Sequence, residues 1–233
     1  MGELTIRWIG QSGYLLRDGE TEICIDPYLS NVVDRIAKRG RMVAPPFPPA
    51  ALASDVVICS HDHLDHVDID AIPQMDKAHM LFLAPTHAQK TLLACGVTNY
   101  LPFDEGATYT AGAFRLTAVF ADHSVPAVGI LVEHGGLTLY FTGDTEYNER
   151  LCALRDRQID LLFVCINGRL GNMNASEAVR LTRALSPRLG IPTHYGMFES
   201  NTADPQSYLS QLSCGFQMVY NTEYKVKEML SYV

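Results

Sequence analysis

The chain has 233 residues, of which 47% are hydrophobic and 19% charged, and its formal net charge is −8. This length suits one domain spanning residues 1–233, and the composition is that of a globular protein rather than a disordered one. Because nucleic-acid binding relies on a broad basic surface, the acidic balance argues against a nucleic-acid partner.

The cellular location is predicted from the start of the chain and from its cysteines. The sequence opens on a strand-like segment rather than on a basic region followed by a long apolar stretch, so we expect neither export nor a membrane span. The six cysteines show no Cys-x-x-Cys spacing and most lie in apolar runs. We therefore expect free thiols in a cytoplasmic protein.

The first part of the chain reads as short strands over 4–9, 13–17 and 22–26. Asp18-Gly19 predicts a hairpin between the second and third, because glycine tolerates the positive φ of tight turns. A basic cluster follows, formed by Arg35, Lys38, Arg39 and Arg41. A solvated helix end is the favoured interpretation of this cluster, and contact with an anionic substrate at the mouth of a site is the alternative. The proline-rich residues 43–50 predict an extended connection.

Further strands and helices alternate along the rest of the chain. The predicted strands cover residues 55–59, 114–120, 127–133, 137–142, 160–166, 189–191 and 217–221. The predicted helices cover residues 86–95, 174–185 and 205–212. Gly135-Gly136 indicates a hairpin, and Asn174 with Glu177 three residues later resembles a capping box at a helix start.

A dense group of metal-ligating side chains follows the apolar run at 55–59. His61, His63, Asp65 and His66 stand within six residues. Imidazole nitrogen and carboxylate oxygen are ligands that zinc and similar divalent metals prefer. Six residues cannot surround two ions, so further ligands are expected at the ends of other strands.

Three residues satisfy that expectation, because each comes soon after an apolar strand. They are His123, Asp144 and His194. In contrast, His79, His87 and His134 have no such context, and we expect surface or satisfied histidines there. Asp62 and Asp68 are expected to be loop or capping carboxylates.

This ligand series resembles that of the metallo-β-lactamase superfamily, and within it the ascorbate-6-phosphate lactonase-like branch is the most similar. The resemblance extends over nearly the whole chain. Its further matching stretches are Trp8-Ile9-Gly10-Gln11-Ser12-Gly13, Ile25-Asp26-Pro27-Tyr28, Asn167-Gly168-Arg169, Asn172-Met173-Asn174 and 192–198.

The resemblance implies an α/β fold, a four-layer αβ/βα sandwich with two divalent ions, Zn or Mn, at one edge. It assigns His61, His63 and His123 to one ion and Asp65, His66 and His194 to the other. Asp144 would bridge them, and Asp26 would hold a ligand histidine in its tautomer. A hydroxide between the ions would be the nucleophile, with Asp65 and Asp144 as catalytic carboxylates.

The expected substrate is a small, anionic metabolite, a lactone or related ester, and a homo-oligomer is plausible from the branch. Arg169, Asn172 and Tyr195 are the candidate substrate contacts, since Arg169 offers a fork of donors for a carboxylate or phosphate. Their alternatives are a surface arginine, a turn former and a packing residue. A phosphodiesterase or nuclease of the same fold and a non-catalytic metal-binding protein remain as competing functions.

Overall fold

The computed structural model describes residues 2–232, and within them the strands form two sheets. The first sheet has the order β13-β1-β2-β3-β4-β5-β6 and the second β12-β11-β10-β9-β8-β7. The strands of the first sheet are β1 Thr5–Gly10, β2 Gly13–Arg17, β3 Glu22–Ile25, β4 Val56–Ile58, β5 Leu81–Ala84, β6 Tyr100–Pro102 and β13 Glu223–Lys225. Those of the second are β7 Thr108–Ala111, β8 Phe114–Phe120, β9 Val128–His134, β10 Leu137–Phe141, β11 Leu161–Cys165 and β12 Leu189–Thr193.

Helices cover the outer faces of both sheets. The α-helices are α1 Val32–Ala37, α2 Gln89–Ala94, α3 Ala175–Leu185, α4 Gln206–Leu209 and α5 Val226–Met229. Short 3-10 segments are η1 Pro49–Ala51, η2 Ile72–Gln74, η3 Thr86–Ala88, η4 Glu149–Arg157 and η5 Leu230–Tyr232. No helix within residues 2–232 combines the length and the apolar character needed to cross a bilayer.

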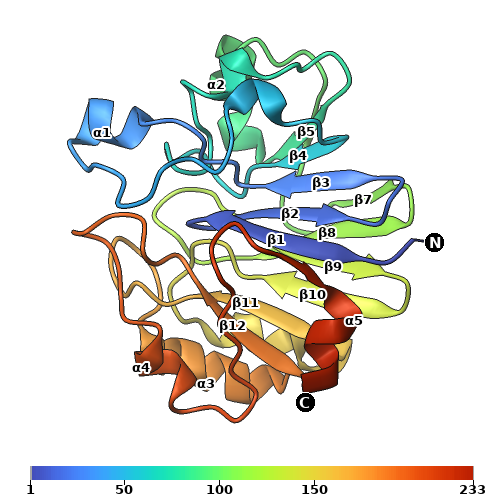
Figure 1. The fold of residues 1–233 in the computed structure, drawn as a ribbon, viewed down its shortest axis with the longest axis vertical. Coiled ribbons are helices and arrows are strands. Elements are labelled where there is room, and N and C mark those ends of the chain that lie inside the picture. The colour runs from blue at the N-terminus through green and yellow to red at the C-terminus, as the bar shows by residue number, and fades with distance from the viewer. Residues whose placement is uncertain (1, 233) are drawn as a thin grey trace.

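The two sheets lie face to face, with α2 on one outer side and α3 and α4 on the other, while α1 stands beyond the strand ends (Figure 1). This layering confirms the expected α/β sandwich. Both sheets are mixed: β3 to β6 and β10 to β12 pair in parallel, and the remaining neighbours pair antiparallel. Apart from the partly exposed edge strand β6, the parallel strands are largely buried, which is why they read as continuous apolar runs.

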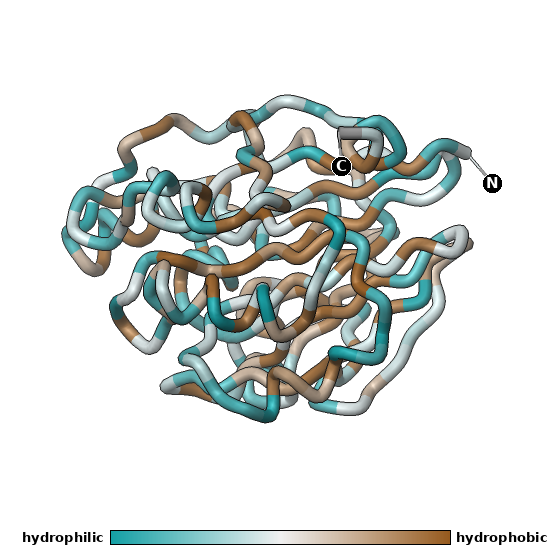
Figure 2. Tube along the Cα trace, turned by 90° about the horizontal axis from the view of Figure 1, so that it is seen from below, coloured by the Kyte–Doolittle hydropathy of each residue, from teal (hydrophilic) through white to brown (hydrophobic). Residues whose placement is uncertain are grey.

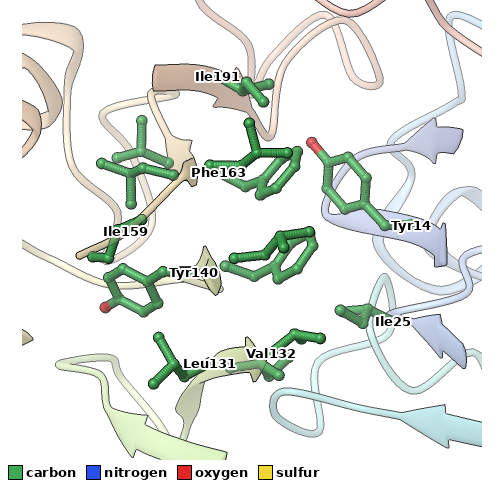
Figure 3. Packing of buried hydrophobic residues seen from close by; sticks show 14 of the residues in the cluster. Tyr14, Ile25, Leu131, Val132, Tyr140, Ile159, Phe163 and Ile191 are labelled. Atoms are coloured by element: carbon green, nitrogen blue, oxygen red, sulfur yellow. The ribbon is translucent and has the colours of Figure 1, made fainter. Parts of the chain in front are cut away.

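Alternation along the strands divides the first sheet between two cores. On β2, Tyr14 and Leu16 face the interior between the sheets, whereas Leu15 packs outward. Figure 3 shows Tyr14 against Phe163 of β11, their ring centroids 4.8 Å apart. The hydrophobic stretches of the chain accordingly run through the middle of the molecule (Figure 2). A strand with both faces buried holds the loop at its end in a fixed position.

Two expectations for the last part of the chain are wrong. Residues 217–221 form no strand: the Val219 backbone N–H donates to the Tyr224 hydroxyl, and Val219 is 60% exposed. The free edge of β1 is instead paired by β13, a few residues later. The expected helix at 205–212 is also shorter, because α4 ends at Leu209. The six cysteines are free, as expected.

Candidate metal centre

The seven proposed ligands come from the loops that follow four strands. His61, His63, Asp65 and His66 follow β4, His123 follows β8, Asp144 follows β10 and His194 follows β12. Three groups of these side chains bring their ligand atoms within 4.8 Å of one another. The groups are His61–His63–His123, His61–His66–Asp144 and Asp65–His66–His194.

The first group consists of three imidazoles that turn nitrogen atoms towards one another. His61 Nε2 lies 3.0 Å from His63 Nδ1, which lies 3.2 Å from His123 Nε2. Tetrahedral coordination with metal–nitrogen bonds of about 2.0–2.1 Å separates neighbouring nitrogens by roughly 3.3 Å. The spacing of these nitrogens therefore fits one divalent ion.

The second group joins histidines to carboxylates. His194 Nε2 lies 3.1 Å from Asp144 Oδ2 and 3.7 Å from Asp65 Oδ2, and His66 Nε2 lies 3.5 Å from Asp144 Oδ2. Within residues 2–232, His66 Nε2 and Asp144 Oδ1 are buried without a hydrogen-bond partner. Buried polar atoms without partners are costly, and a cation would satisfy both at once. A second divalent ion thus fits this group.

Asp26 fixes the orientation of His66. Its Oδ2 lies 2.8 Å from His66 Nδ1, and its two oxygens accept the backbone N–H and the hydroxyl of Ser60. Asp26 is itself 1% exposed and follows β3. Because one ring nitrogen of His66 is engaged by this carboxylate, the other is left free to face the ligand cluster.

Three further residues hold the ligands in place. Gln11 Nε2 donates to Asp65 Oδ2 at 2.8 Å and also lies 3.1 Å from His194 Nε2. Asn172 Nδ2 donates to Asp144 Oδ2 at 2.9 Å. His123 Nδ1 lies 2.9 Å from the carbonyl oxygen of Gly171, which leaves Nε2 to the cluster. Such outer hydrogen bonds set ring tautomers and carboxylate planes before any ion binds.

On one side of the site the imidazoles favour their neutral forms, and on the other side histidines and carboxylates favour each other's charged forms. Burial lowers the pKa of His61 well below its usual value, and burial together with the neighbouring His123 lowers the pKa of His63. Burial also disfavours charge on His66, yet the nearby carboxylates raise its pKa well above normal. His194 and His66 hold the pKa of buried Asp144 well below its usual range despite desolvation. Neutral imidazole and ionised carboxylate are the forms that bind metals.

A cavity of about 450 Å³ opens onto the cluster, a volume in the range of small-molecule sites. His63, Asp65, Asp144 and His194 contribute to its wall. The rest of the lining is Val33, Ala37, Arg39, Leu64, Ser124, Leu170, Phe198 and Asn201. The ligand cluster therefore lies at the surface of a hollow that can receive a small molecule.

The three expected substrate contacts lie outside this lining. Arg169 is exposed and donates to the carbonyl of Ser200 at 3.5 Å. Asn172 contacts Asp144 rather than the cavity. Tyr195 is 8% exposed and packs on Trp8, with ring centroids 5.0 Å apart. In the structure, Asn172 thus contacts a proposed ligand, and Tyr195 packs against Trp8.

The histidines outside the motif are dispersed. His79 and His87 are exposed, and His87 lies 3.3 Å from the Asp62 carboxylate. His134 is buried, and its Nε2 lies 3.0 Å from Asp18 Oδ2. Asp68 accepts the backbone N–H groups of Leu29 and Ser30, which ties the β3–α1 loop to the motif loop.

The comparisons with known proteins agree with this geometry. A family model for the beta-lactamase superfamily domain matches residues 5–194. The chain belongs to the metallo-β-lactamase superfamily. It is 30% identical over 217 residues to a UPF0173 metal-dependent hydrolase of Deinococcus radiodurans, with 89% of this chain and 91% of the relative covered, and it belongs with these hydrolases.

Two solved structures show the same fold. Igni18, a metallo hydrolase of Ignicoccus hospitalis, superposes with a TM-score of 0.75 at 19% identity, covering 95% of this chain and 97% of that one. The metallo-beta-lactamase fold protein YhfI of Bacillus subtilis gives a TM-score of 0.74 at 19% identity, covering 96% and 99%.

Sequence reasoning did not single out Gln11, Ser60 or Arg39 as individual site residues. Gln11 directly follows β1 and Ser60 lies two residues beyond the end of β4, so the position that identified the ligands also applies to them. Their residue types carry no metal signal, however. The backbone offers a second clue that only the structure gives: Gln11, Asp26 and His194 all have positive φ, at 53°, 43° and 60°. Such strained non-glycine residues gather at functional sites.

Proposed function

We propose that the chain is a metal-dependent hydrolase that cleaves a small anionic metabolite, a lactone or related ester, at a centre of two divalent ions, Zn or Mn. The observation that carries the proposal is the convergence of imidazole and carboxylate ligands from four strand ends beside a cavity. A single structural role, such as bracing a loop, does not require so many buried titratable groups in one place.

The ligands divide between the two ions as follows. His61, His63 and His123 would hold one, and Asp65, His66 and His194 the other. Asp144 would be shared, because its carboxylate lies with His61 and His66 and also 3.1 Å from His194 Nε2. When bound, the two ions would supply a nucleophile by lowering the pKa of water and would stabilise negative charge on a carbonyl or phosphoryl oxygen.

The protein's own contribution is to bind the substrate and orient the reacting groups. Asp65 lines the cavity, and the amide of Gln11 fixes the plane of its carboxylate. Asp65 is therefore the carboxylate best placed to orient the attacking water. Asn172 restrains Asp144 in the same way from the other side of the cluster. Held this rigidly, the groups need little reorganisation during reaction.

A panel assay tests the proposal. Protein stripped with a chelator and reloaded with Zn or Mn would be assayed against lactones, carboxylic esters, thioesters and phosphodiesters. We expect hydrolysis of lactones or esters that depends on the added metal. Turnover confined to phosphodiesters would favour the phosphodiesterase alternative. Full metal loading without turnover of any class would indicate a non-catalytic metal-binding protein.

A further inference from the structure

The cavity beside the ligand cluster has a predominantly apolar wall. Val33 and Ala37 come from α1, Leu64 from the motif loop, and Leu170 and Phe198 from two later loops. Leu170 is 55% exposed at this wall, so its side chain is open to contact with an apolar group in the cavity. The lining therefore favours a molecule with an apolar body over a fully hydrated sugar.

One cationic side chain interrupts this wall. Arg39 follows α1 and lines the cavity, and among residues 2–232 it is the one lysine or arginine to do so. Its guanidinium makes no hydrogen bond or ion pair within that range. A guanidinium left free beside a cavity can form paired hydrogen bonds with an oxyanion.

The other cations of the basic cluster are already engaged. Arg35 forms an ion pair with Asp70 at 2.6 Å, and Lys38 Nζ donates to the Arg35 carbonyl. Arg41 donates to the carbonyls of Tyr28 and Val43 and stacks on the Tyr28 ring. Among the described residues, Arg39 alone of the four makes no hydrogen bond or ion pair through its side chain, and it alone lines the cavity.

Asn201 adds a neutral donor to the same cavity. Its side-chain oxygen accepts from Asn167 Nδ2 at 2.8 Å, so its NH₂ group is turned away from that bond. The residue is 5% exposed and lines the cavity, and its Nδ2 donates to no atom within residues 2–232. A buried amide that faces a cavity with a free donor suits an oxygen acceptor on the ligand.

We propose that Arg39 and Asn201 form an oxyanion-binding subsite, and that the substrate is an amphiphile with an apolar body and one anionic group apart from its scissile bond. The anionic group is a carboxylate, a sulfonate or a phosphonate-like oxyanion. That the bound molecule is a substrate rests on the proposed hydrolase function. Binding at the subsite itself can be tested without turnover.

The binding test uses two fluorescent probes of the same shape. 8-Anilinonaphthalene-1-sulfonate carries an oxyanion on an apolar body, and N-phenyl-1-naphthylamine lacks the sulfonate. Metal-loaded wild type should bind the sulfonate more tightly than the neutral probe. Arg39→Ala should weaken sulfonate binding about tenfold or more and change the neutral probe less than about twofold, since one charge-assisted contact is lost.

Companion variants sharpen the assignment. The affinity of Arg39→Lys for the sulfonate probe should fall between those of wild type and Arg39→Ala, because lysine keeps the charge and loses the paired donors of the guanidinium. Asn201→Asp keeps the acceptor for Asn167 but replaces the free donor with a negative charge. It should therefore weaken binding of the sulfonate probe more than binding of the neutral probe. Arg155→Ala removes an exposed arginine of η4 outside the lining and should bind both probes as wild type does.

The reaction arm uses 4-nitrophenyl valerate, the mono-4-nitrophenyl ester of glutaric acid, and 4-nitrophenyl 4-phosphonobutanoate. Wild type should prefer the acidic esters through a lower KM, and the better of the two identifies carboxylate or phosphonate as the favoured group. Arg39→Ala should lose that preference, because the KM values of the acidic esters should rise towards that of the valerate ester.

The outcomes separate the two proposals. Equal weakening of both probes in Arg39→Ala, or an equally large effect in Arg155→Ala, overturns the subsite. A selective loss in Arg169→Ala instead would return the anion contact to Arg169. If the probes behave as expected but no ester is hydrolysed with either metal, the subsite stands and the proposed hydrolase function fails.

Discussion

The Asn172 amide donates to Asp144 Oδ2 at 2.9 Å, and it reaches that carboxylate from a loop 28 residues further along the chain. The bond fixes the carboxylate that the proposed centre shares between its two ions. Asp144 Oδ1 is left buried without a partner in the described residues. Asp144, the proposed shared ligand, is therefore restrained through Oδ2, whereas Oδ1 has no hydrogen-bond partner among the described residues.

Asp144→Ala should abolish hydrolysis and lower the affinity for both ions together, because each ion would lose a carboxylate that neutralises its charge. Asn172→Ala should be milder, with a fall of about 10- to 100-fold in metal affinity or activity, since it loosens the ligand without removing it. Elemental analysis after dialysis measures both. Retention of two ions by Asp144→Ala would contradict the shared role.

Asp26→Asn should weaken binding of the ion at His66, because an amide cannot favour the ring orientation as a carboxylate does. We expect a loss of about 10- to 100-fold in affinity for one ion. Titration against a competing chelator gives the value. Asp62→Asn is the control, since its partner His87 is exposed, and an equal loss there would remove the special role of Asp26.

Gly171→Ala should release the ion bound through His123. A Cβ at this position would lie 2.9 Å from His123 Nδ1, and the φ of +84° disfavours any side chain. Gly135→Ala is the matched control, because it has a φ of +57° but open space around its Cβ. Metal stoichiometry should fall in the first variant alone. Full metal content in both variants would show that the loop carrying His123 can move to accommodate the added methyl group without loss of the ion.

The histidines outside the ligand set should tolerate glutamine with near-normal turnover and full metal content. His79→Gln and His87→Gln should also keep their stability, because both side chains are exposed. His134→Gln should lose about 1–3 kcal/mol of unfolding free energy, since buried Asp18 loses its partner. Denaturation and metal analysis test this. Loss of metal in any of the three would show that the ligand set is misassigned.

Acid should weaken the fold partly through Asp18. Its pKa is lowered although burial opposes this, because the N–H groups of Thr21 and Glu20 and the ring of His134 favour the ionised form. A lowered folded pKa gives stability that is present above the unfolded value, about 3.9, and is lost as pH falls through the folded value. Urea midpoints from pH 6 to pH 3 should therefore fall less steeply for Asp18→Asn than for wild type. Identical slopes would contradict this contribution.

Local pattern predicted most of the strands and the places of the candidate ligands after them, whereas the sandwich architecture was implied by the resemblance to the metallo-β-lactamase superfamily. Apolar runs such as 55–59 mark strands buried on both faces, and a charged or imidazole side chain directly after such a run must lie at a sheet edge. The strand expected at 217–221 does not form, because β13 pairs with Thr5–Arg7 of β1, and the Asn221 backbone N–H donates to the Trp8 carbonyl beyond that pairing. Local sequence carries no information about which edge is free.

The parts of the site that could not be predicted depend on contacts between distant segments. Arg169 and Arg39 are both basic residues near loops, and only the tertiary structure places Arg39 on the cavity wall. Tyr195 follows a ligand directly, yet its ring turns towards Trp8 because β1 lies beside that loop. The direction of the Tyr195 side chain depends on which strand lies beside it, and this cannot be read from the local sequence.

Gln11 and His194 touch although 183 positions separate them along the chain. During synthesis, the amino-terminal loops emerge long before the residues that complete the cluster, and non-local contacts of this kind form late. A nascent chain that ends before His194 would expose the His61–His66 loop to any metal ion present, without the partners that select and retain it. The order of the sequence thus makes completion of the proposed metal centre depend on the segment that carries His194, the last of its ligands along the chain.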